Sequence, residues 1–204
     1  MCQLIETICL YNGQLQNIER HQQRFQTSRK ELLGIDEVID LKHVIEKKLT
    51  EQNFKNLVRS CFKCRLVYGK EIQSIEFTPY IPKNVNSLQL IENQNIDYRY
   101  KYLDRSMFTL LLSTAKTDDV LITQNGWITD TSFANVVFFD GKNWITPTTF
   151  LLHGTKRQLL LNTKQITENE IHHRDLKTFL FARLINAMLD FENTPVIPIK
   201  QIFV

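Results

Sequence analysis

The stretch that most constrains this chain is residues 120–147, VLITQNGWITDTSFANVVFFDGKNWITP, which has the pattern of two consecutive β-hairpins. At the end of its second strand the apolar run stops at Asp130, Thr131 and Ser132, and it resumes only past Asn135. An acidic residue and several small polar residues therefore interrupt a strand pattern. This interruption needs a chemical explanation.

Composition limits the class of protein. The 204 residues are 43% apolar and 23% charged, which is ordinary for a soluble globular protein of one large or two small domains. The 25 basic and 22 acidic residues give a net charge of +3 without a long run of like charge, so we expect neither a nucleic-acid partner nor a membrane surface. Basic residues could still bind an anionic small molecule. With no signal-peptide pattern and no apolar run of membrane-spanning length, the expected location is cytoplasmic.

Four cysteines occur, at positions 2, 9, 61 and 64, and Cys61 and Cys64 have the CxxC spacing of some metal and redox sites. The surrounding LVRSCFKCRLVYG alternates like a strand, in which residues three apart point to opposite faces, so we expect the two sulfurs to diverge. No second cysteine pair or suitably spaced histidine supplies further ligands. The sequence therefore predicts structural cysteines and no metal site.

The first half of the chain mixes strands and helices. LIETICLYNGQLQ predicts two short strands joined at Asn12 and Gly13, a strong hairpin signal. Apolar residues recur near helical spacing through NIERHQQRFQTSRKELLG, which ends in Gly34, and DEVIDLKHVIEKKLTEQN predicts a second helix. Three strands are expected next, at residues 57–68, 72–77 and 88–91.

The segment TPYIPKNVNS, between the last two of these strands, is the best candidate for a domain linker. It holds both prolines of the first half of the chain and two asparagines. We predict a small domain at residues 1–80, a linker at 81–87 and a larger domain at 88–204. The larger domain should contain a helical tail in YRYKYLDRSMFTLLLSTAK, the two hairpins, a helix over Thr155–Asn162 and a final αβ stretch. The expected fold class is α+β.

Lys101 is the first candidate for chemistry. It lies just before a predicted helix and among Tyr98, Tyr100 and Tyr102. A lysine among aromatic surfaces loses part of its preference for the charged form through desolvation, which makes its amine nucleophilic near neutral pH. From this segment alone, an ordinary surface lysine is the more common case.

Two further segments could bind an anion. In LLHGTKRQLLLN, Gly154 is followed at once by an amphipathic helix whose first N–H groups form an anion site, although many helices begin this way. In HQQRFQTS, His21, Arg24 and Ser28 share one helical face. Arg24 could bind a phosphate, while a solvated arginine or one at the edge of the core is commoner.

Six short motifs, taken in order, resemble one family. They are ET(I), HxxRFxxS, KxLxR, GxITDTSxxNVVF, TP and GTxR, and the match runs from Glu6 almost to the C-terminus. Together they are similar to the class IV, fold type IV pyridoxal-phosphate (PLP) enzymes, which include branched-chain and D-amino-acid aminotransferases and aminodeoxychorismate lyases. The resemblance implies a small N-terminal α/β domain, a larger C-terminal mixed, β-barrel-like domain with helices, PLP as cofactor and a homodimer.

The resemblance assigns a role to Asp130. Family members have an acidic residue at this position, usually glutamate, which pairs with the pyridine nitrogen of the cofactor and keeps it protonated. Asp130 is one methylene shorter than that glutamate. Thr131, Ser132 and Asn135 resemble the small polar residues around the ring. Hydrogen bonds within the turn are the favoured alternative for Thr131 and Ser132, and both interpretations stay open for Asn135.

Two basic residues receive roles from the same resemblance. Lys101 resembles the lysine that forms the Schiff base with PLP and, once displaced by substrate, moves a proton as general acid and base. Arg24 resembles the phosphate-binding arginine. The resemblance thus predicts that both residues contact the cofactor.

Two other segments resemble phosphate contacts of the family. The first is the glycine-led loop whose N–H groups hold the phosphate, here Gly154, Thr155 and Lys156. Arg157 closes this motif and can be structural. The second is a turn near the C-terminus, where Asn186 and Ala187 stand in place of the usual serine or threonine. A contact through backbone N–H is favoured there.

The residues around Lys101 bear on the substrate, a small molecule with an amino group. The segment KYLDR is nearest to the Lys-x-Leu-Asn-Arg pattern of the lyases, with Asp104 in place of asparagine. The resemblance therefore favours a 4-amino-4-deoxychorismate lyase, which releases 4-aminobenzoate and pyruvate in folate biosynthesis. A branched-chain or D-amino-acid aminotransferase and a non-catalytic PLP-binding protein are the alternatives. Candidates to bind the substrate carboxylate are Arg59, Arg65, Arg99, Arg105 and a residue of a second subunit.

Overall fold

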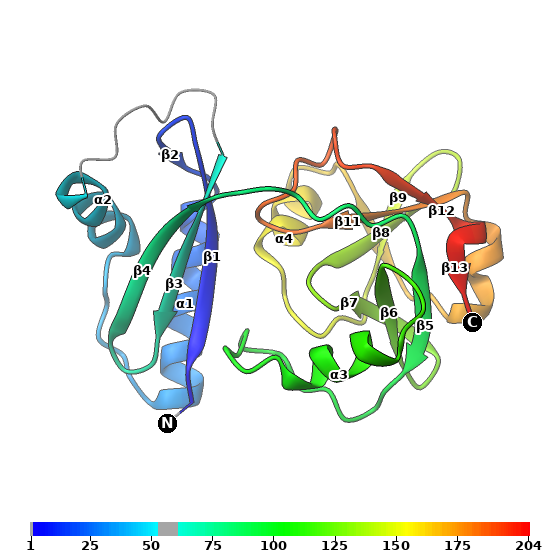
Figure 1. Ribbon diagram of the computed structural model, residues 1–204, viewed down its shortest axis with the longest axis horizontal. Helices are drawn as coiled ribbons and strands as arrows, with labels where there is room; N and C mark the ends of the chain where they lie inside the picture. Colours follow the sequence, from blue (N-terminus) through cyan, green and yellow to red (C-terminus); the bar gives the residue numbers. More distant parts are fainter. Residues whose placement is uncertain (1, 53–60) are drawn as a thin grey trace. The chain divides into compact units, whose positions relative to one another are not determined.

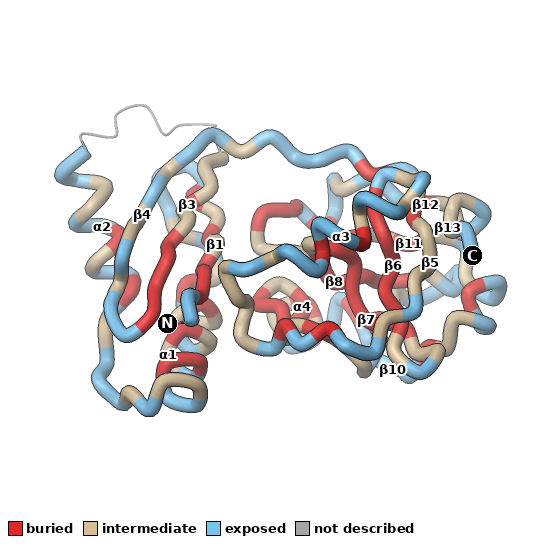
Figure 2. Tube along the Cα trace, turned by 60° about the horizontal axis from the view of Figure 1, so that its bottom comes forward, coloured by how far each residue is buried: buried red, intermediate tan, exposed pale blue. Residues whose placement is uncertain are grey.

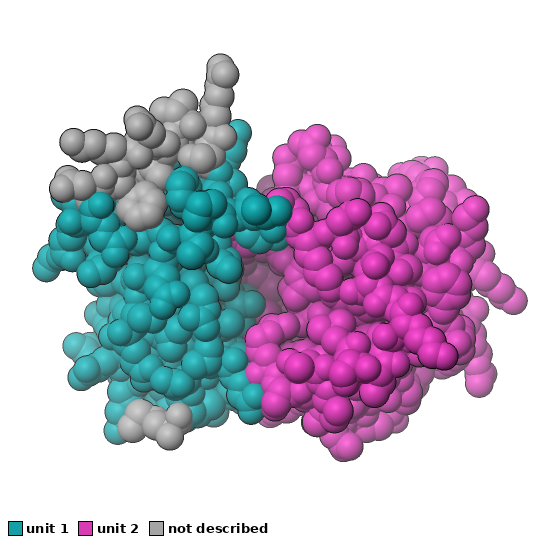
Figure 3. Space-filling view, viewed as in Figure 1, with its two compact units in different colours: residues 1–81, 100–104 teal, residues 82–99, 105–204 magenta. Residues whose placement is uncertain are grey.

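The computed structural model describes residues 2–52 and 61–204 (Figure 1). The chain divides into two compact units, which Figure 3 distinguishes by colour. The first unit consists of Met1–Ile81 and Tyr100–Asp104, and the second consists of Pro82–Arg99 and Arg105–Val204. Helices and strands occur in both units, and the predicted α+β class is confirmed.

The described residues of the first unit form a four-stranded antiparallel sheet with two helices. Its strands are β1 (Leu4–Tyr11), β2 (Gln14–Leu15), β3 (Cys61–Tyr68) and β4 (Ile72–Pro79), in the order β2-β1-β3-β4, and its helices are α1 (Ile18–Leu33) and α2 (Leu41–Glu51). Leu4 and Ile8 of β1 share one hydrophobic cluster with Phe25 of α1 and Ile45 of α2. Both helices therefore pack on the same face of the sheet.

The sequence of β1 determines which face is buried. Leu4, Glu6 and Ile8 are all completely buried, and because side chains alternate along a strand they point to the same face. The predicted hairpin at Asn12 and Gly13 is confirmed: their φ angles of 50° and 78° suit the tight turn between β1 and β2. The alternation places one carboxylate, that of Glu6, on the core face of the sheet.

Both predicted helices of this unit are present. Helix α1 ends at Leu33, and Gly34 follows it with a φ of 69°, a conformation that glycine adopts without strain. Helix α2 begins only at Leu41, later than the sequence pattern suggested. The Asp40 carboxylate accepts a hydrogen bond from the His43 N–H at 3.0 Å, which caps the helix and determines where it starts.

Strands β3 and β4 confirm the described parts of the strands predicted at residues 57–68 and 72–77, and residues 57–60 lie outside the described residues. The two cysteines of the CxxC motif make separate contacts. Cys64 is buried in the core, and its burial raises the pKa of the thiol to about 12, so that it stays protonated. The Cys61 Sγ instead lies 3.3 Å from the Cys9 Sγ.

The second unit contains two sheets that share one core, with strand orders β13-β5-β6-β7 and β10-β9-β8-β11-β12. Its elements are β5 (Leu88–Glu92), α3 (Ser106–Thr114), β6 (Asp119–Gln124), β7 (Trp127–Thr131), β8 (Asn135–Phe139), β9 (Trp144–Pro147), α4 (Thr155–Asn162), β10 (Thr167–Asn169), β11 (Phe181–Ile185), β12 (Val196–Pro198) and β13 (Ile202–Phe203). Leu121 of β6, Val136 of β8 and Leu184 of β11 belong to a single hydrophobic cluster. Figure 2 shows buried positions along β6, β7 and β8. The domain predicted to be barrel-like is thus built from two sheets, without a closed barrel among the described residues.

The two hairpins predicted over residues 120–147 are confirmed. Strand β6 pairs with β7 and β8 pairs with β9, both antiparallel. The polar interruption lies where the chain leaves β7 in one sheet and enters β8 in the other. Asp130 is therefore close to the point where the two sheets are joined.

The final stretch of the chain differs from the prediction. Strands are present, but the described residues after Asn162 contain no α-helix. The helical turns there are short 3-10 segments, His173–Thr178 and Ile199–Gln201. Strand β11, which lies between them, pairs with β8 and β12, and this pairing leaves only short connections for helical structure.

Residues 100–104 join the first unit, although the sequence pattern placed them in the larger domain. The Ile5 N–H donates to the Lys101 carbonyl oxygen at 3.1 Å, and the Leu103 N–H donates to the Gln3 carbonyl oxygen at 2.9 Å. These hydrogen bonds attach the segment to the edge of β1. Such a long-range pairing leaves no signal in the local sequence pattern.

The longest helix among the described residues is α1. It has 16 residues. Helix α4 begins and ends at the residues predicted from the sequence. Within residues 2–52 and 61–204, no helix is both long and apolar enough to cross a membrane.

Candidate active site

Glu6 is the centre of a charged cluster inside the first unit. Its side chain is completely buried, and Arg24 donates two hydrogen bonds to it, from Nε to Oε1 at 2.7 Å and from Nη2 to Oε2 at 2.6 Å. The His21 Nδ1–H donates to the same Oε2 at 2.6 Å. His21 and Arg24 lie three residues apart on α1, so that one helical face presents both side chains to β1.

The electrostatics of this cluster determine its charge state. Burial by itself raises the pKa of Glu6, but the charge and hydrogen bonds of Arg24, with a smaller effect of His21, lower the pKa to about 2. The pKa of His21 is lowered, mainly by burial, although its contact with Glu6 acts in the opposite direction. Near neutral pH the cluster therefore consists of a carboxylate, a guanidinium and a neutral imidazole.

The family motifs predict Arg24 as a phosphate ligand and assign no role to Glu6. The structure shows that a bidentate ion pair with Glu6 orients the Arg24 guanidinium. A signal was present, because Glu6 occupies an inward position of the alternating LIETICLY pattern, and a buried carboxylate requires a partner. The contact of Arg24 with a phosphate stays a prediction.

Lys101 lies in the segment that pairs with β1. Its φ is 55°, in the left-handed region that residues other than glycine rarely adopt. The rings of Tyr100 and Tyr102 on either side are 6.1 Å apart and pack against the core of the first unit, whereas Tyr98 packs edge to face on Phe108 in the second unit. Backbone strain of this kind costs about 1–3 kcal/mol. The exposed Lys164, which follows α4, has a similar φ of 57°. The role of Lys101 as the lysine that binds the cofactor stays a prediction.

Asp130 is buried near the end of β7, with 5% of its surface exposed. Its Oδ1 accepts a hydrogen bond from the Asn135 Nδ2 at 2.7 Å, and its Oδ2 accepts two from the backbone N–H groups of Leu151 and Leu152, at 3.0 and 2.9 Å. Burial raises the pKa of Asp130 to about 6, although these hydrogen bonds favour the charged form. Asp130 is thus a carboxylate near neutral pH that a cation would stabilise further.

Asn135 connects Asp130 to the loop before α4. Its Nδ2 also donates to the Leu152 carbonyl oxygen at 2.9 Å. A Cβ atom on Gly154 would lie 1.9 Å from the Asn135 Oδ1, so the close approach of the Asn135 amide requires glycine there. Helix α4 starts at the next residue, Thr155. The first N–H groups of the helix, which have no partner within the helix, therefore come immediately after Gly154 in the chain.

The other residues of the GTxR motif differ in their surroundings. Thr155 is buried and Lys156 is partly exposed. Arg157 is almost completely buried and donates from Nη2 to the Pro147 carbonyl oxygen at 2.9 Å and to the Glu168 carboxylate at 2.7 Å. Arg157 thus ties α4 to β9 and β10, which supports its structural interpretation. Phosphate binding by Thr155 and Lys156 stays a prediction.

The small polar residues after Asp130 take part in turn contacts. The Thr131 Oγ1 donates to the Ala134 carbonyl oxygen at 3.0 Å. The Ser132 Oγ donates to the Asp119 carboxylate at 3.0 Å. These are the turn hydrogen bonds expected for Thr131 and Ser132 from the sequence.

Asn186 and Ala187 belong to the turn after β11. The Asn186 Oδ1 accepts hydrogen bonds from the N–H groups of Met188 and Leu189 at 2.8 and 3.1 Å, and its Nδ2 donates to the Phe133 carbonyl oxygen at 3.5 Å. The Asn186 side chain therefore shapes this turn. A contact of the turn with a phosphate stays a prediction.

Arg105, the residue that made the KxLxR motif lyase-like, is engaged within the second unit. It donates from Nη1 to the Tyr98 hydroxyl at 3.0 Å and from Nη2 to the Ser132 carbonyl oxygen. These contacts weaken its case as the partner of a substrate carboxylate. The other candidates are Arg99, which pairs with Asp97 at 2.8 Å, Arg65 on β3, and Arg59, which lies outside the described residues.

A comparison with protein families identifies the chain. The model of the family described as amino-transferase class IV matches residues 3–202. The chain belongs to the class IV aminotransferase family. Enzymes of this family depend on PLP, and the chain is accordingly a PLP-dependent lyase or aminotransferase, as its motifs predict.

Relatives of similar length agree with this assignment. A Haemophilus influenzae protein described as uncharacterized is 37% identical over 191 residues, which cover 92% of this chain and 98% of that protein. A crystal structure from Haemophilus somnus, provisionally assigned as a 4-amino-4-deoxychorismate lyase, is 33% identical, with a TM-score of 0.85 and coverage of 92% of this chain and 97% of that one. The PLP-bound form of a hypothetical aminotransferase from Mycobacterium tuberculosis shares the fold at 15% identity, with a TM-score of 0.71 and coverage of 98% of this chain and 81% of that one.

Each unit, taken by itself, contains side chains whose chemistry suits a part of PLP. The first unit supplies Arg24, whose guanidinium is already oriented, and Lys101 in a strained conformation. The second unit supplies Asp130, a buried carboxylate suited to a cation, and the close-packed Gly154 at the start of α4. Each requirement of the cofactor, an amine, a phosphate ligand and a partner for the ring nitrogen, thus has a candidate.

Proposed function

We propose that this enzyme binds PLP through Arg24, Lys101, Asp130 and the start of α4, and that it is a 4-amino-4-deoxychorismate lyase. The observation that carries the choice of lyase is the 33% identity over 92% of the chain with the Haemophilus somnus structure. The KYLDR segment around Lys101 supports the same choice.

When bound, PLP supplies a protonated ring that accepts the electron pair left when a substrate C–H bond breaks. Asp130 would hold the proton on the ring nitrogen. Its burial raises its pKa to about 6, which makes its carboxylate more basic than an exposed aspartate, and a positive charge beside it would offset the desolvation. Asn135 and the loop N–H groups fix the direction of this carboxylate.

Lys101 would bind the aldehyde carbon of the cofactor and then, as a free amine, carry the proton. The amine takes the proton from the substrate carbon that bears nitrogen and returns it to the product. In the lyase, the electron pair of that C–H bond would form a new double bond of the substrate ring, and the pair of the neighbouring C–O bond would leave with the enol ether oxygen. The released enol takes up a proton to give pyruvate, and the ring becomes 4-aminobenzoate. Arg24 would offset the charge of the phosphate, and Glu6 orients it for this contact.

An aminotransferase would use the same residues but deliver the proton to the cofactor instead. It would then need a keto acid to accept the amino group before the next cycle. The two functions therefore differ in a simple observable, the need for an amino-group acceptor. A non-catalytic PLP-binding protein would require neither Lys101 as a base nor Asp130 as a partner of the ring.

The test is an assay of the purified PLP-loaded protein on 4-amino-4-deoxychorismate without any keto acid. We expect steady formation of 4-aminobenzoate and pyruvate. If the amine form of the cofactor instead accumulates with L- or D-amino acids, and 2-oxoglutarate or pyruvate restarts turnover, the enzyme is an aminotransferase. No turnover in either assay, with PLP bound, would favour the non-catalytic protein.

We also propose a homodimer in the cytoplasm that contributes to folate biosynthesis. The family resemblance supports the dimer, and the lyase reaction supports the pathway. Light scattering coupled to gel filtration tests the dimer, for which a monomeric mass at micromolar concentration would be contrary evidence. Growth of a deletion strain with and without 4-aminobenzoate tests the pathway.

A further inference from the structure

The turn that follows Asp130, residues 131–134, is held together by its own hydrogen bonds. The Thr131 N–H donates to the Ala134 carbonyl oxygen at 2.8 Å, and the Ala134 N–H donates to the Thr131 Oγ1 at 3.1 Å. Ser132 lies within this turn with only 3% of its surface exposed. The turn directly joins Asp130 to Asn135, which hydrogen bonds to the Asp130 carboxylate.

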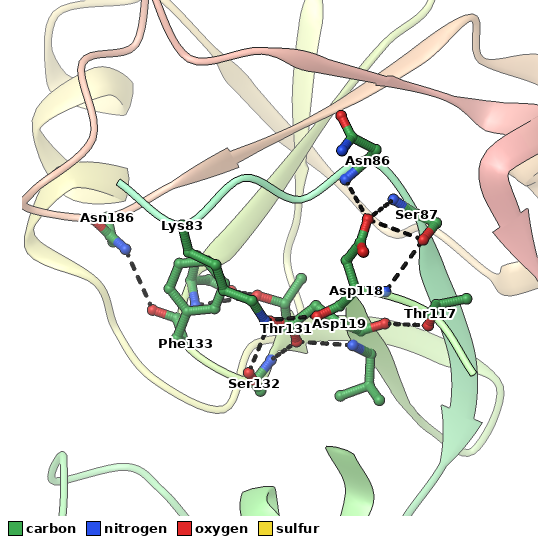
Figure 4. Close-up of polar contacts among 12 residues, drawn as sticks. Lys83, Asn86, Ser87, Thr117, Asp118, Asp119, Thr131, Ser132, Phe133 and Asn186 are labelled. Atoms are coloured by element: carbon green, nitrogen blue, oxygen red, sulfur yellow. Dashed lines mark hydrogen bonds and ion pairs between the residues drawn. The ribbon is translucent and has the colours of Figure 1, made fainter. Parts of the chain in front are cut away.

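Ser132 is held from one side by Asp119, the first residue of β6. The Ser132 Oγ donates to the Asp119 Oδ2 at 3.0 Å, and the Ser132 N–H donates to Oδ1 at 3.2 Å (Figure 4). Asp119 is completely buried. A buried carboxylate of this kind requires a positive partner.

Lys83 is that partner. Its Nζ donates to the Asp119 Oδ2 at 2.9 Å and to the Asp118 carbonyl oxygen at 2.6 Å (Figure 4). The ammonium also lies 5.5 Å from the centre of the Phe133 ring, the next side chain of the turn. Lys83 therefore contacts the turn both through Asp119 and directly through Phe133.

Arg105 holds Ser132 from the other side. Its Nη2 donates to the Ser132 carbonyl oxygen. The guanidinium is itself fixed, because it donates to the Tyr98 hydroxyl and lies 4.9 Å from the centre of the Phe108 ring. The N–H, the hydroxyl and the carbonyl of Ser132 are thus all engaged.

Lys83 and Arg105 each lie at the start of one of the two chain segments that form the second unit. The second unit starts at Pro82 and resumes at Arg105. Lys83 is the second residue of the first of these two segments, and Arg105 is the first residue of the other. Each segment of the second unit is therefore anchored, at its N-terminal end, to the turn that follows Asp130.

We propose that Lys83 and Arg105 are positioning residues, which fix residues 131–134 and through them the Asp130 carboxylate that faces the cofactor ring. This inference rests on the proposed role of Asp130. It also gives Arg105 of the lyase-like motif a role in shaping the site in place of direct contact with a substrate carboxylate. The two residues act through Ser132, and neither needs to touch the cofactor.

The test compares Lys83→Met with Lys83→Arg in the full-length protein, with Lys142→Met as the control. Methionine keeps an unbranched apolar side chain but removes the donor, arginine keeps the charge, and Lys142 is an exposed lysine at the other hairpin of the same unit. Hydrogen exchange of the peptide covering residues 130–135, measured without cofactor, should accelerate about tenfold in Lys83→Met, since a hydrogen bond to a charged group is lost. Lys83→Arg should restore the protection, and Lys142→Met should not change it.

The affinity for PLP is the second measurement. It should fall in Lys83→Met and return in Lys83→Arg, while exchange in the peptides of β9 and β10 stays as in the parent. Unchanged exchange at residues 130–135, or faster exchange throughout the second unit, would overturn the proposal. Faster local exchange with an unchanged PLP affinity would also overturn it, because the turn would then not position Asp130. If the parent itself binds no PLP, the proposed function fails, and the exchange data alone decide whether Lys83 fixes the residues around Asp130.

Discussion

Replacing Glu6 by glutamine tests the charged cluster of the first unit. The change is nearly isosteric, but it removes the negative charge that pairs with Arg24 and leaves that cation, whose side chain is only 9% exposed, without its counter-ion. The pKa of Glu6 falls from 4.5 to about 2 on folding. At about 1.4 kcal/mol per pKa unit, this difference corresponds to roughly 3 kcal/mol of stability. We expect Glu6→Gln to lose stability of this order near neutral pH.

The pH dependence provides a sharper criterion. Since the pKa of Glu6 is lower in the folded than in the unfolded chain, its stabilisation is present above pH 4.5 and is lost as the pH falls toward about 2. The pKa of His21 is lowered as well, so its contribution also decreases with acid, from its ordinary value of 6.5 downward. Glu6→Gln also removes the contact that raises the pKa of His21, so His21 contributes to the difference between parent and variant below pH 6.5. The part of the difference that comes from Glu6 itself should shrink only below pH 4.5.

The assay must report on the first unit. Both tryptophans, Trp127 and Trp144, lie in the second unit, so their fluorescence does not monitor the cluster directly. Urea unfolding followed by far-UV circular dichroism, with hydrogen exchange of the α1 peptides, is suitable. Glu31→Gln, a change at an exposed position of the same helix, is the matched control and should leave the unfolding free energy unchanged. Equal stability of Glu6→Gln and parent near neutral pH would show that the ion pair between Glu6 and Arg24 does not stabilise the fold.

Three further predictions concern the cofactor site. Arg24→Ala should weaken PLP binding at least about tenfold in an absorbance titration, because a charge-assisted phosphate contact is lost, and an equal affinity would exclude this role. Asp130→Asn should keep part of the PLP binding but slow turnover by about a hundredfold or more, since an amide cannot hold the ring nitrogen protonated, whereas unchanged turnover would mean that the aspartate does not reach the ring. Gly154→Ala should destabilise the second unit by about 1–3 kcal/mol, because its Cβ would lie 1.9 Å from the Asn135 Oδ1. Thermal unfolding followed by tryptophan fluorescence checks this change, and a melting temperature equal to that of the parent would contradict it.

Local patterns predicted the elements whose ends are set by neighbouring residues. The hairpins at Asn12-Gly13 and Asn125-Gly126 form as expected because all four residues have positive φ, between 50° and 78°. Helix α4 was predicted with its observed bounds. The local sequence pattern is sufficient to predict these turns and this helix, because their hydrogen bonds join residues that are close in sequence.

Contacts between distant segments could not be predicted in the same way. The strand pattern places Glu6 inward, but its partners His21 and Arg24 lie on a helix that the pattern does not orient. The segment around Lys101 gave no sign that it pairs with β1. Lys83 was assigned to a linker, and only the structure shows its ion pair with a buried aspartate 36 residues later.

The proposed bond between Lys101 and the cofactor can be observed by covalent trapping. The parent protein is loaded with PLP, reduced with borohydride, digested and examined by mass spectrometry, with Lys101→Ala treated in parallel. We predict a phosphopyridoxyl group on the peptide that contains Lys101 of the parent, and no stoichiometric label in the variant. A label on another lysine of the parent, or equal labelling of the variant, would show that Lys101 does not carry the cofactor.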